Sequence, residues 1–259
     1  MQLKVRALIA WVFMAVMIAV NAMANILPIN GMNTGEISAL YPNRFVPDGF
    51  TFSIWSLIYL LLLAFVVMST VTAWKRDGTP VSSLAHQLLP WFLITCILNA
   101  GWIIAWHYLL VGLSVLIMLV FLITLIRIYL IIYPHQHLLS PGQRIWIYTP
   151  FVVYLGWISV ATIANITALL VSQQWGGWGF DPSAWSIVMI LIASALGLVF
   201  GWFRKDAAYA LVIAWALYGI YRGQGKSYPW IGNISALSAA FLCGMVVLEK
   251  IRSFGKRAR

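Results

Sequence analysis

Charged residues are scarce in this sequence. Asp, Glu, Lys and Arg together make up 8% of the 259 residues, whereas 63% are hydrophobic. A water-soluble domain of this length cannot bury so much apolar surface, so the composition predicts that lipid is the solvent. No segment shows the strict alternation of a membrane barrel strand, and we therefore expect an all-α, polytopic helical membrane protein.

Acidic residues are the rarer charged class, with six against sixteen basic residues. A carboxylate in the middle of a membrane is costly and is usually kept for transport or proton transfer. All six lie in loops or at predicted helix ends, which disfavours a proton-driven mechanism: Glu36, Asp48, Asp77, Asp181, Asp206 and Glu249. P-loop, dinucleotide-binding and HExxH motifs are also missing, and no Ser/His/Asp set falls on one face. We therefore expect that the protein is not an enzyme.

Cysteine and histidine offer little for metal binding. Cys96 and Cys243 lie in apolar runs and are interpreted as packing residues rather than a disulfide or a metal pair. His107 could ligate a haem iron, but a histidine near the interface is more often solvated or bonded to a carbonyl group. His135 and His137 share an exposed loop without further ligands, so no metal site is expected there.

Long apolar runs dominate what is present. A bilayer core about 30 Å thick needs roughly 20 apolar residues per helix. Eight segments qualify as candidates, of which the seventh is short: 7–27, 50–73, 88–108, 110–133, 146–172, 184–203, 207–221 and 230–249.

The basic residues predict how these helices are oriented. With eight spans, all the Lys and Arg residues fall on one side except Arg44, Arg222 and Lys226. Positive charge marks the cytoplasmic side, so both chain ends are expected in the cytoplasm of a cell-membrane protein. The basic tail 250–259 then lies beside anionic lipid, and no nucleic-acid partner is expected. Alternatively, residues 1–24 are a cleaved signal, which would leave seven spans.

The loops and small residues suggest a division of the chain near residue 173. The outer stretch 28–49 is either an ordered loop or lid or a plain connector. The Trp-rich segment 173–185 is interpreted as a marker of the lipid headgroup level. Gly197 and Gly201 form a GxxxG pair, which predicts close helix packing in the C-terminal part.

Three predicted helices each carry aromatic and hydrogen-bonding residues on one face. Residues three, four or seven positions apart share a helix face, so each set forms a stripe. Together the stripes could line an apolar pocket with a few polar anchors, although a lone intramembrane Asn most often joins helices. The stripes are Trp55 and Tyr59; Asn99, Trp102 and Trp106; and Tyr154, Trp157, Ala161 and Asn165.

These stripes resemble the TspO/MBR family, the tryptophan-rich sensory proteins that include the translocator protein (peripheral benzodiazepine receptor). The resemblance covers residues 45–170. It rests on FVPDGFTFSIWSLIYLLL, which holds Pro47, Phe52, Trp55 and Tyr59; on LNAGW; and on YLGWISVATIAN. The chain departs from the family pattern at Ser53 and Val153, where the family has proline, and no Trp occurs in the expected fourth helix.

The resemblance implies a five-helix core, residues 1–173, followed by an additional three-helix segment, residues 174–259. It also implies a small flat hydrophobic ligand, such as a tetrapyrrole (porphyrin or haem) or another lipophile, bound without being a required cofactor. A possible homodimer is a further implication. The residues that would line or brace the ligand site are Trp55, Tyr59, Asn99, Trp102, Tyr154, Trp157 and Asn165.

Three functions remain open on the sequence. The first is a membrane protein that binds such a ligand in an intramembrane aromatic pocket and has a sensory or regulatory role. The second is a small-molecule permease, in which the same aromatic residues line a path. The third is a scaffold for another membrane protein, in which the stripes are helix–helix contacts.

Overall fold

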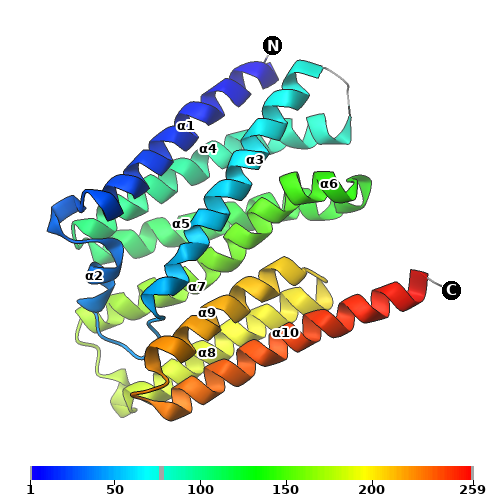
Figure 1. Cartoon of the computed structure of the whole chain (residues 1–259). Helices are drawn as coiled ribbons and strands as arrows, with labels where there is room; N and C mark the ends of the chain where they lie inside the picture. Colours follow the sequence, from blue (N-terminus) through cyan, green and yellow to red (C-terminus); the bar gives the residue numbers. More distant parts are fainter. Residues whose placement is uncertain (1, 76–78, 258–259) are drawn as a thin grey trace. The chain divides into compact units, whose positions relative to one another are not determined.

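The computed structural model describes residues 2–75 and 79–257, and every regular element in these ranges is helical (Figure 1). Residue 1, residues 76–78 (which include Asp77) and the last two residues of the basic tail lie outside the described residues. The chain divides into two compact units, and each takes two stretches of sequence. Unit 1 is Met1–Ala39 with Ile54–Ile158, and unit 2 is Leu40–Ser53 with Ser159–Arg259.

Within the described residues, seven helices are long and apolar enough to cross a membrane. They extend over Gln2–Gly31, Gly49–Lys75, Pro80–His107, Val111–Leu138, Pro141–Ser172, Pro182–Phe203 and Pro229–Arg252. The segment predicted as a span at 207–221 is instead α9 (Ala207–Gln224), 18 residues long and less apolar because Tyr221, Arg222 and Gln224 lie in its last turns. The expected eight spans are therefore revised to about seven.

Unit 1 is built around one central helix, α4 (Pro80–His107), which packs against α1 (Gln2–Ile26) and α5 (Val111–Ile132). Helix α1 also packs against α3 (Ile54–Lys75). Helix α4 begins earlier than its apolar run because Thr79 caps it, accepting a hydrogen bond from the Ser82 N–H, and Pro80 suits the first turn. The other elements are η1 (Ile29–Gly31), α2 (Thr34–Ala39), η3 (Tyr133–Leu138), α6 (Pro141–Gln143), the π-helical turn η4 (Arg144–Tyr148) and the first part of α7 (Thr149–Ser172).

Unit 2 contains three helices that run side by side: α8 (Pro182–Leu198), α9 and α10 (Pro229–Arg257) (Figure 1). Gly197 allows close packing, because a Cβ atom there would lie 2.7 Å from a methyl group of Leu242. Gly201, in the π-helical turn η6 (Val199–Phe203), faces the Met245 side chain even more closely. The prediction that this GxxxG pair serves packing is confirmed.

Segment 40–53, which includes η2 (Gly49–Ser53), docks onto α9 within unit 2. The Asp48 N–H donates to the Gly219 carbonyl oxygen at 2.9 Å, and the Trp215 indole donates to the Thr51 carbonyl oxygen at 2.9 Å. The Gln224 side chain donates to the Val46 carbonyl oxygen at 2.9 Å. Half of the predicted outer stretch 28–49 is thus held by a helix far along the chain, so the segment is ordered rather than a plain connector.

Both cysteines are free thiols, and they belong to different units. Cys96 is buried in α4, where its small side chain packs among helices, whereas Cys243 is exposed on α10. The packing interpretation therefore applies to Cys96, and Cys243 lies on the outer face of its helix.

We expect Gly219→Ala to destabilise the protein by about 1–3 kcal/mol, because the new methyl group would overlap the Thr51 side chain, whose Cγ2 atom lies 2.7 Å from the Cβ position. Thermal unfolding in detergent measures the change. The matched control is Gly244→Ala on α10, where nothing lies within 4 Å of the Cβ position. The control should be neutral or stabilising by up to about 1 kcal/mol, and equal melting temperatures for the two variants would contradict the docking.

Candidate functional site

A chain of hydrogen bonds joins three helices at the centre of unit 1. Asn99 of α4 is completely buried. Its carbonyl oxygen accepts from the Asn21 side chain of α1 at 2.6 Å, and its amide donates to the Tyr154 hydroxyl of α7 at 2.8 Å. Asn21 also donates to the Met17 carbonyl oxygen at 2.9 Å. The buried amides therefore have partners on neighbouring helices, which fixes the relative rotation of α1, α4 and α7.

An aromatic cluster surrounds Trp55 of α3. Its ring centroid lies 5.6 Å from that of Tyr59, with the planes 21° apart, and 6.4 Å from that of Trp102, with the planes 28° apart. The rings of Tyr154 and Trp157 meet Trp55 edge-on, at 5.9 Å and 6.1 Å. These separations and angles are those of favourable aromatic pairs. Trp55 thus contacts all three predicted stripes.

The cluster combines buried and accessible groups. Trp102, Tyr154 and Trp157 are buried, whereas Trp55 and Tyr59 are half-buried. The Tyr59 hydroxyl oxygen is buried, and although Asn99 lies near it, the hydroxyl makes no well-formed hydrogen bond to the described residues. Leaving a buried hydroxyl unsatisfied costs about 1–3 kcal/mol, so this atom is an unusual feature of the cluster.

A layer of phenylalanines supports the cluster. Phe65 of α3 packs against Phe92 of α4 at 5.5 Å and against Phe151 of α7 at 4.8 Å between ring centroids. Phe121 of α5 meets Tyr154 edge-on at 5.1 Å. Helix α5 lacks the tryptophan of the family pattern, and Phe121 supplies an aromatic ring from that helix instead.

His107, at the end of α4, is held by the segment that follows α1. The ring is buried, its Nδ1 lies 3.1 Å from the Ile29 carbonyl oxygen, and its Nε2 lies 3.1 Å from the Thr34 hydroxyl. The Asn30 side chain donates to the His107 carbonyl oxygen at 3.0 Å. The two ring nitrogens thus each have a polar partner. His107 therefore fixes segment 29–34 over the end of α4, bonded to a carbonyl group as expected.

The predicted site residues are brought together with one exception. Trp55, Tyr59, Asn99, Trp102, Tyr154 and Trp157 form the cluster described above. Asn165 is buried farther along α7, in the part of that helix that belongs to unit 2. Asn21 and Phe121 also belong to the cluster, but neither falls in one of the three predicted stripes. Among the described residues, no three His, Cys, Asp or Glu side chains are placed to hold a metal ion.

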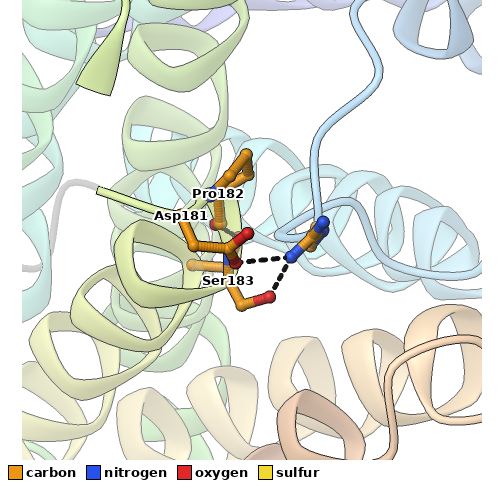
Figure 2. A network of polar contacts seen from close by, with 5 residues as sticks. Asp181, Pro182 and Ser183 are labelled. Atoms are coloured by element: carbon orange, nitrogen blue, oxygen red, sulfur yellow. Dashed lines mark hydrogen bonds and ion pairs between the residues drawn. The ribbon is translucent and has the colours of Figure 1, made fainter. Parts of the chain in front are cut away.

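A second polar group lies at one end of unit 2, around Arg44. Its guanidinium donates to the Asp181 carboxylate at 2.8 Å and to the Ser183 hydroxyl (Figure 2). Asp181 caps α8 by accepting from the Ser183 N–H at 2.7 Å, and Pro182 begins the helix. Hydrogen bonds from the Ser183 side chain and backbone, and then the positive charge of Arg44, lower the pKa of Asp181 below its ordinary value. The ion pair thereby joins segment 40–53 to the start of α8.

Comparison with protein families matches residues 7–248 to the family described as TSPO-like protein. The chain therefore belongs to this family, whose members are generally non-enzymatic binding proteins. The match extends well beyond residues 45–170 and includes α8, α9 and most of α10. No curated protein and no solved structure matches the chain.

The Asn99–Tyr154 hydrogen bond should appear as a coupling energy in a double-mutant cycle. We expect Asn99→Leu and Tyr154→Phe to be coupled by about 0.6 kcal/mol, the average for hydrogen bonds between membrane helices. Reversible unfolding in mixed micelles measures the four variants. Thr72→Val is the control partner for Asn99→Leu, because the Thr72 hydroxyl bonds within its own helix, to the Met68 carbonyl oxygen. Equal coupling in both cycles would contradict the assignment.

The Asp181 carboxylate should stabilise the protein in a pH-dependent way. Because its pKa is lowered in the folded state, the contribution is fully present above the ordinary aspartate pKa of about 3.9. It is lost as the pH falls through the lower folded value. We expect Asp181→Asn to lower the thermal midpoint at pH 6, and the difference from wild type to shrink as the pH falls below about 3.9. A difference that stays constant over this range would refute the assignment.

Proposed function

We propose that this TSPO-like membrane protein binds a flat hydrophobic ligand, porphyrin-like or another lipophile, at the aromatic cluster around Trp55. One observation carries the proposal: Trp55 contacts rings from all three stripes and yet remains half-buried. A half-buried ring backed by buried rings offers a flat apolar face that a planar molecule can cover.

The polar groups of the cluster would set the orientation of the ligand. The Asn21–Asn99–Tyr154 chain is satisfied within the protein, so it holds the walls in place and leaves little for the ligand to bond. The Tyr59 hydroxyl lies near Asn99 but makes no well-formed hydrogen bond to the described residues, and we assign it the contact with a polar atom of the ligand. In this proposal, Trp102 and Trp157 form the walls of the ligand site. Asn165 stabilises α7 at a position farther along that helix.

The proposed role is sensory or regulatory, without covalent chemistry. Binding that fills the cluster would rigidify α3, α4 and α7, and such a change can be passed to another protein or to a second copy of the chain. We propose residues 1–173 as the ligand-binding core, residues 174–259 as an additional segment, and a homodimer as the assembly to test. Movement of the ligand across proteoliposomes would instead favour a permease that uses the same aromatic path.

We also propose that the protein lies in the cell membrane with the end of unit 2 that carries Arg44 facing outward. The pairs Arg44–Asp181 and Arg222–Asp48 gather there, whereas Lys205–Glu249 lies beyond the other end of α9. Helix α9 begins next to Lys205 and contains Arg222 in its last turn, so it joins the two ends of unit 2. We therefore propose that α9 also crosses the membrane and that both chain ends lie in the cytoplasm.

Titration with protoporphyrin IX tests the proposed site through the quenching of tryptophan fluorescence in detergent. We expect saturable quenching, weakened about three- to tenfold by Tyr59→Phe, because that change removes only the hydroxyl assigned to the ligand. Trp55→Leu should weaken binding further by removing the central ring face.

The matched control for this titration is Tyr218→Phe, which removes a hydroxyl from an exposed tyrosine of unit 2. It should bind as wild type does. Quenching that does not saturate, or that responds equally to Tyr59→Phe and Tyr218→Phe, would refute the assignment of the site to unit 1.

A further inference from the structure

Unit 2 contains a cavity of its own, separate from the aromatic cluster of unit 1. Its volume is about 330 Å³. Its walls come from segment 42–45, the last turns of α7, the loop after α7 and the start of α8. This volume is near the lower end of the roughly 300–1,000 Å³ typical of small-molecule sites, which suits one or two fused rings rather than a macrocycle.

The loop between α7 and α8 builds the aromatic wall of this cavity. Gly177 adopts a left-handed conformation (φ 61°), and its carbonyl oxygen accepts a hydrogen bond from the Trp185 indole at 2.8 Å. A Cβ atom at Gly177 would lie 3.0 Å from the indole nitrogen, so the loop closes tightly on Trp185. The rings of Trp175 and Trp185 lie 4.9 Å apart, and both line the cavity.

This arrangement refines the expectation that these tryptophans mark the headgroup level. Trp178 is largely exposed, at 78%, and suits that role. Trp175 and Trp185 are half-buried and turn their side chains to the cavity instead. With Phe45 and Phe180, they give the cavity an apolar, aromatic lining.

Arg44 is the only charged side chain among the described residues that line the cavity. One face of its guanidinium lies 4.3 Å from the Tyr228 ring centroid, and its Nη1 atom bonds Asp181 and Ser183. Asp181 is exposed and is not part of the lining. The Nε and Nη2 donors make no hydrogen bond to the described side chains, and a guanidinium edge with two such donors matches a carboxylate.

We propose that this cavity binds an aromatic carboxylate, with its ring against Trp175 and Trp185 and its carboxylate on Arg44. The aromatic walls select a planar apolar body, and the single cationic group selects a negative charge at one edge of it. Asp181 and Ser183 keep the guanidinium in position without occupying all its donors. This site does not depend on the ligand proposed for unit 1.

The test compares 2-naphthoate with its neutral counterpart 2-naphthamide, using saturation-transfer NMR on the full chain in phosphatidylcholine nanodiscs. We expect saturable binding of naphthoate, at least about tenfold tighter than that of the amide. Arg44→Gln should remove this difference by weakening naphthoate binding about tenfold, because it removes the positively charged guanidinium group. Equal binding of the two probes to wild-type protein would overturn the proposal.

Arg222→Gln is the matched control. Arg222 also lies beside a carboxylate, that of Asp48 at 3.9 Å, and over an aromatic ring, that of Phe50 at 5.7 Å, but it does not line the cavity. It should leave naphthoate binding unchanged, as should Tyr59→Phe in unit 1. A loss of binding in Arg222→Gln equal to that in Arg44→Gln would overturn the proposal.

A second variant tests the cavity independently, in case Arg44→Gln fails to fold. Val171→Phe fills the cavity while Arg44 stays in place, and it should abolish binding of both probes. Retained binding would overturn the proposal. Adding phosphatidylglycerol to the nanodiscs should leave naphthoate affinity unchanged, whereas competition by this anionic lipid would assign Arg44 to lipid headgroups instead.

Discussion

The hydrogen bonds of Asn99 are the constraint on which unit 1 depends. In a membrane, apolar side chains have no strong preference for one another over lipid, so helix faces must be matched by packing and by polar contacts. Asn99 meets partners on α1 and α7 at once, through Asn21 and Tyr154. With the rotation of these helices fixed, the Trp102 and Trp157 rings face Trp55 of α3. The arrangement of the aromatic cluster thus depends on the Asn99 side chain, whose oxygen and nitrogen atoms are both hydrogen-bonded to neighbouring helices.

Unit 2 depends on a different device, the close approach of backbones at small residues. Gly197 and Gly201 bring the region of α8 and η6 against α10, and Gly219 brings α9 against Thr51. In a lipid environment such approaches gain dispersion energy and let backbone groups of a non-helical segment find partners. The gap left between the start of α8 and segment 42–45 becomes the cavity that Arg44 lines.

Much of this organisation could be predicted from the sequence, because helical periodicity is a local property. The spacings of Trp55 with Tyr59 and of Tyr154 with Trp157 define helix faces, and those faces do converge. The failures concern contacts that no spacing encodes. Arg44 and Asp181 are 137 positions apart, and nothing local links them. The span predicted at 207–221 is followed directly by the polar residues that end α9 and make that helix less apolar. Asn21 gave no aromatic stripe because no aromatic residue lies three, four or seven positions away from it on α1.

The order of these segments along the chain has a consequence for how the protein is made. Thr51 is synthesised 164 residues before Trp215, the side chain that bonds to its carbonyl oxygen. At about 5–20 residues per second, the interval is on the order of ten seconds or more. During that time the backbone groups of residues 46–51 have no α9 to bond, and they cannot rest in hydrocarbon unsatisfied. Until α9 has been synthesised, residues 46–51 must therefore stay at the membrane surface, where water can hydrogen-bond to their backbone groups.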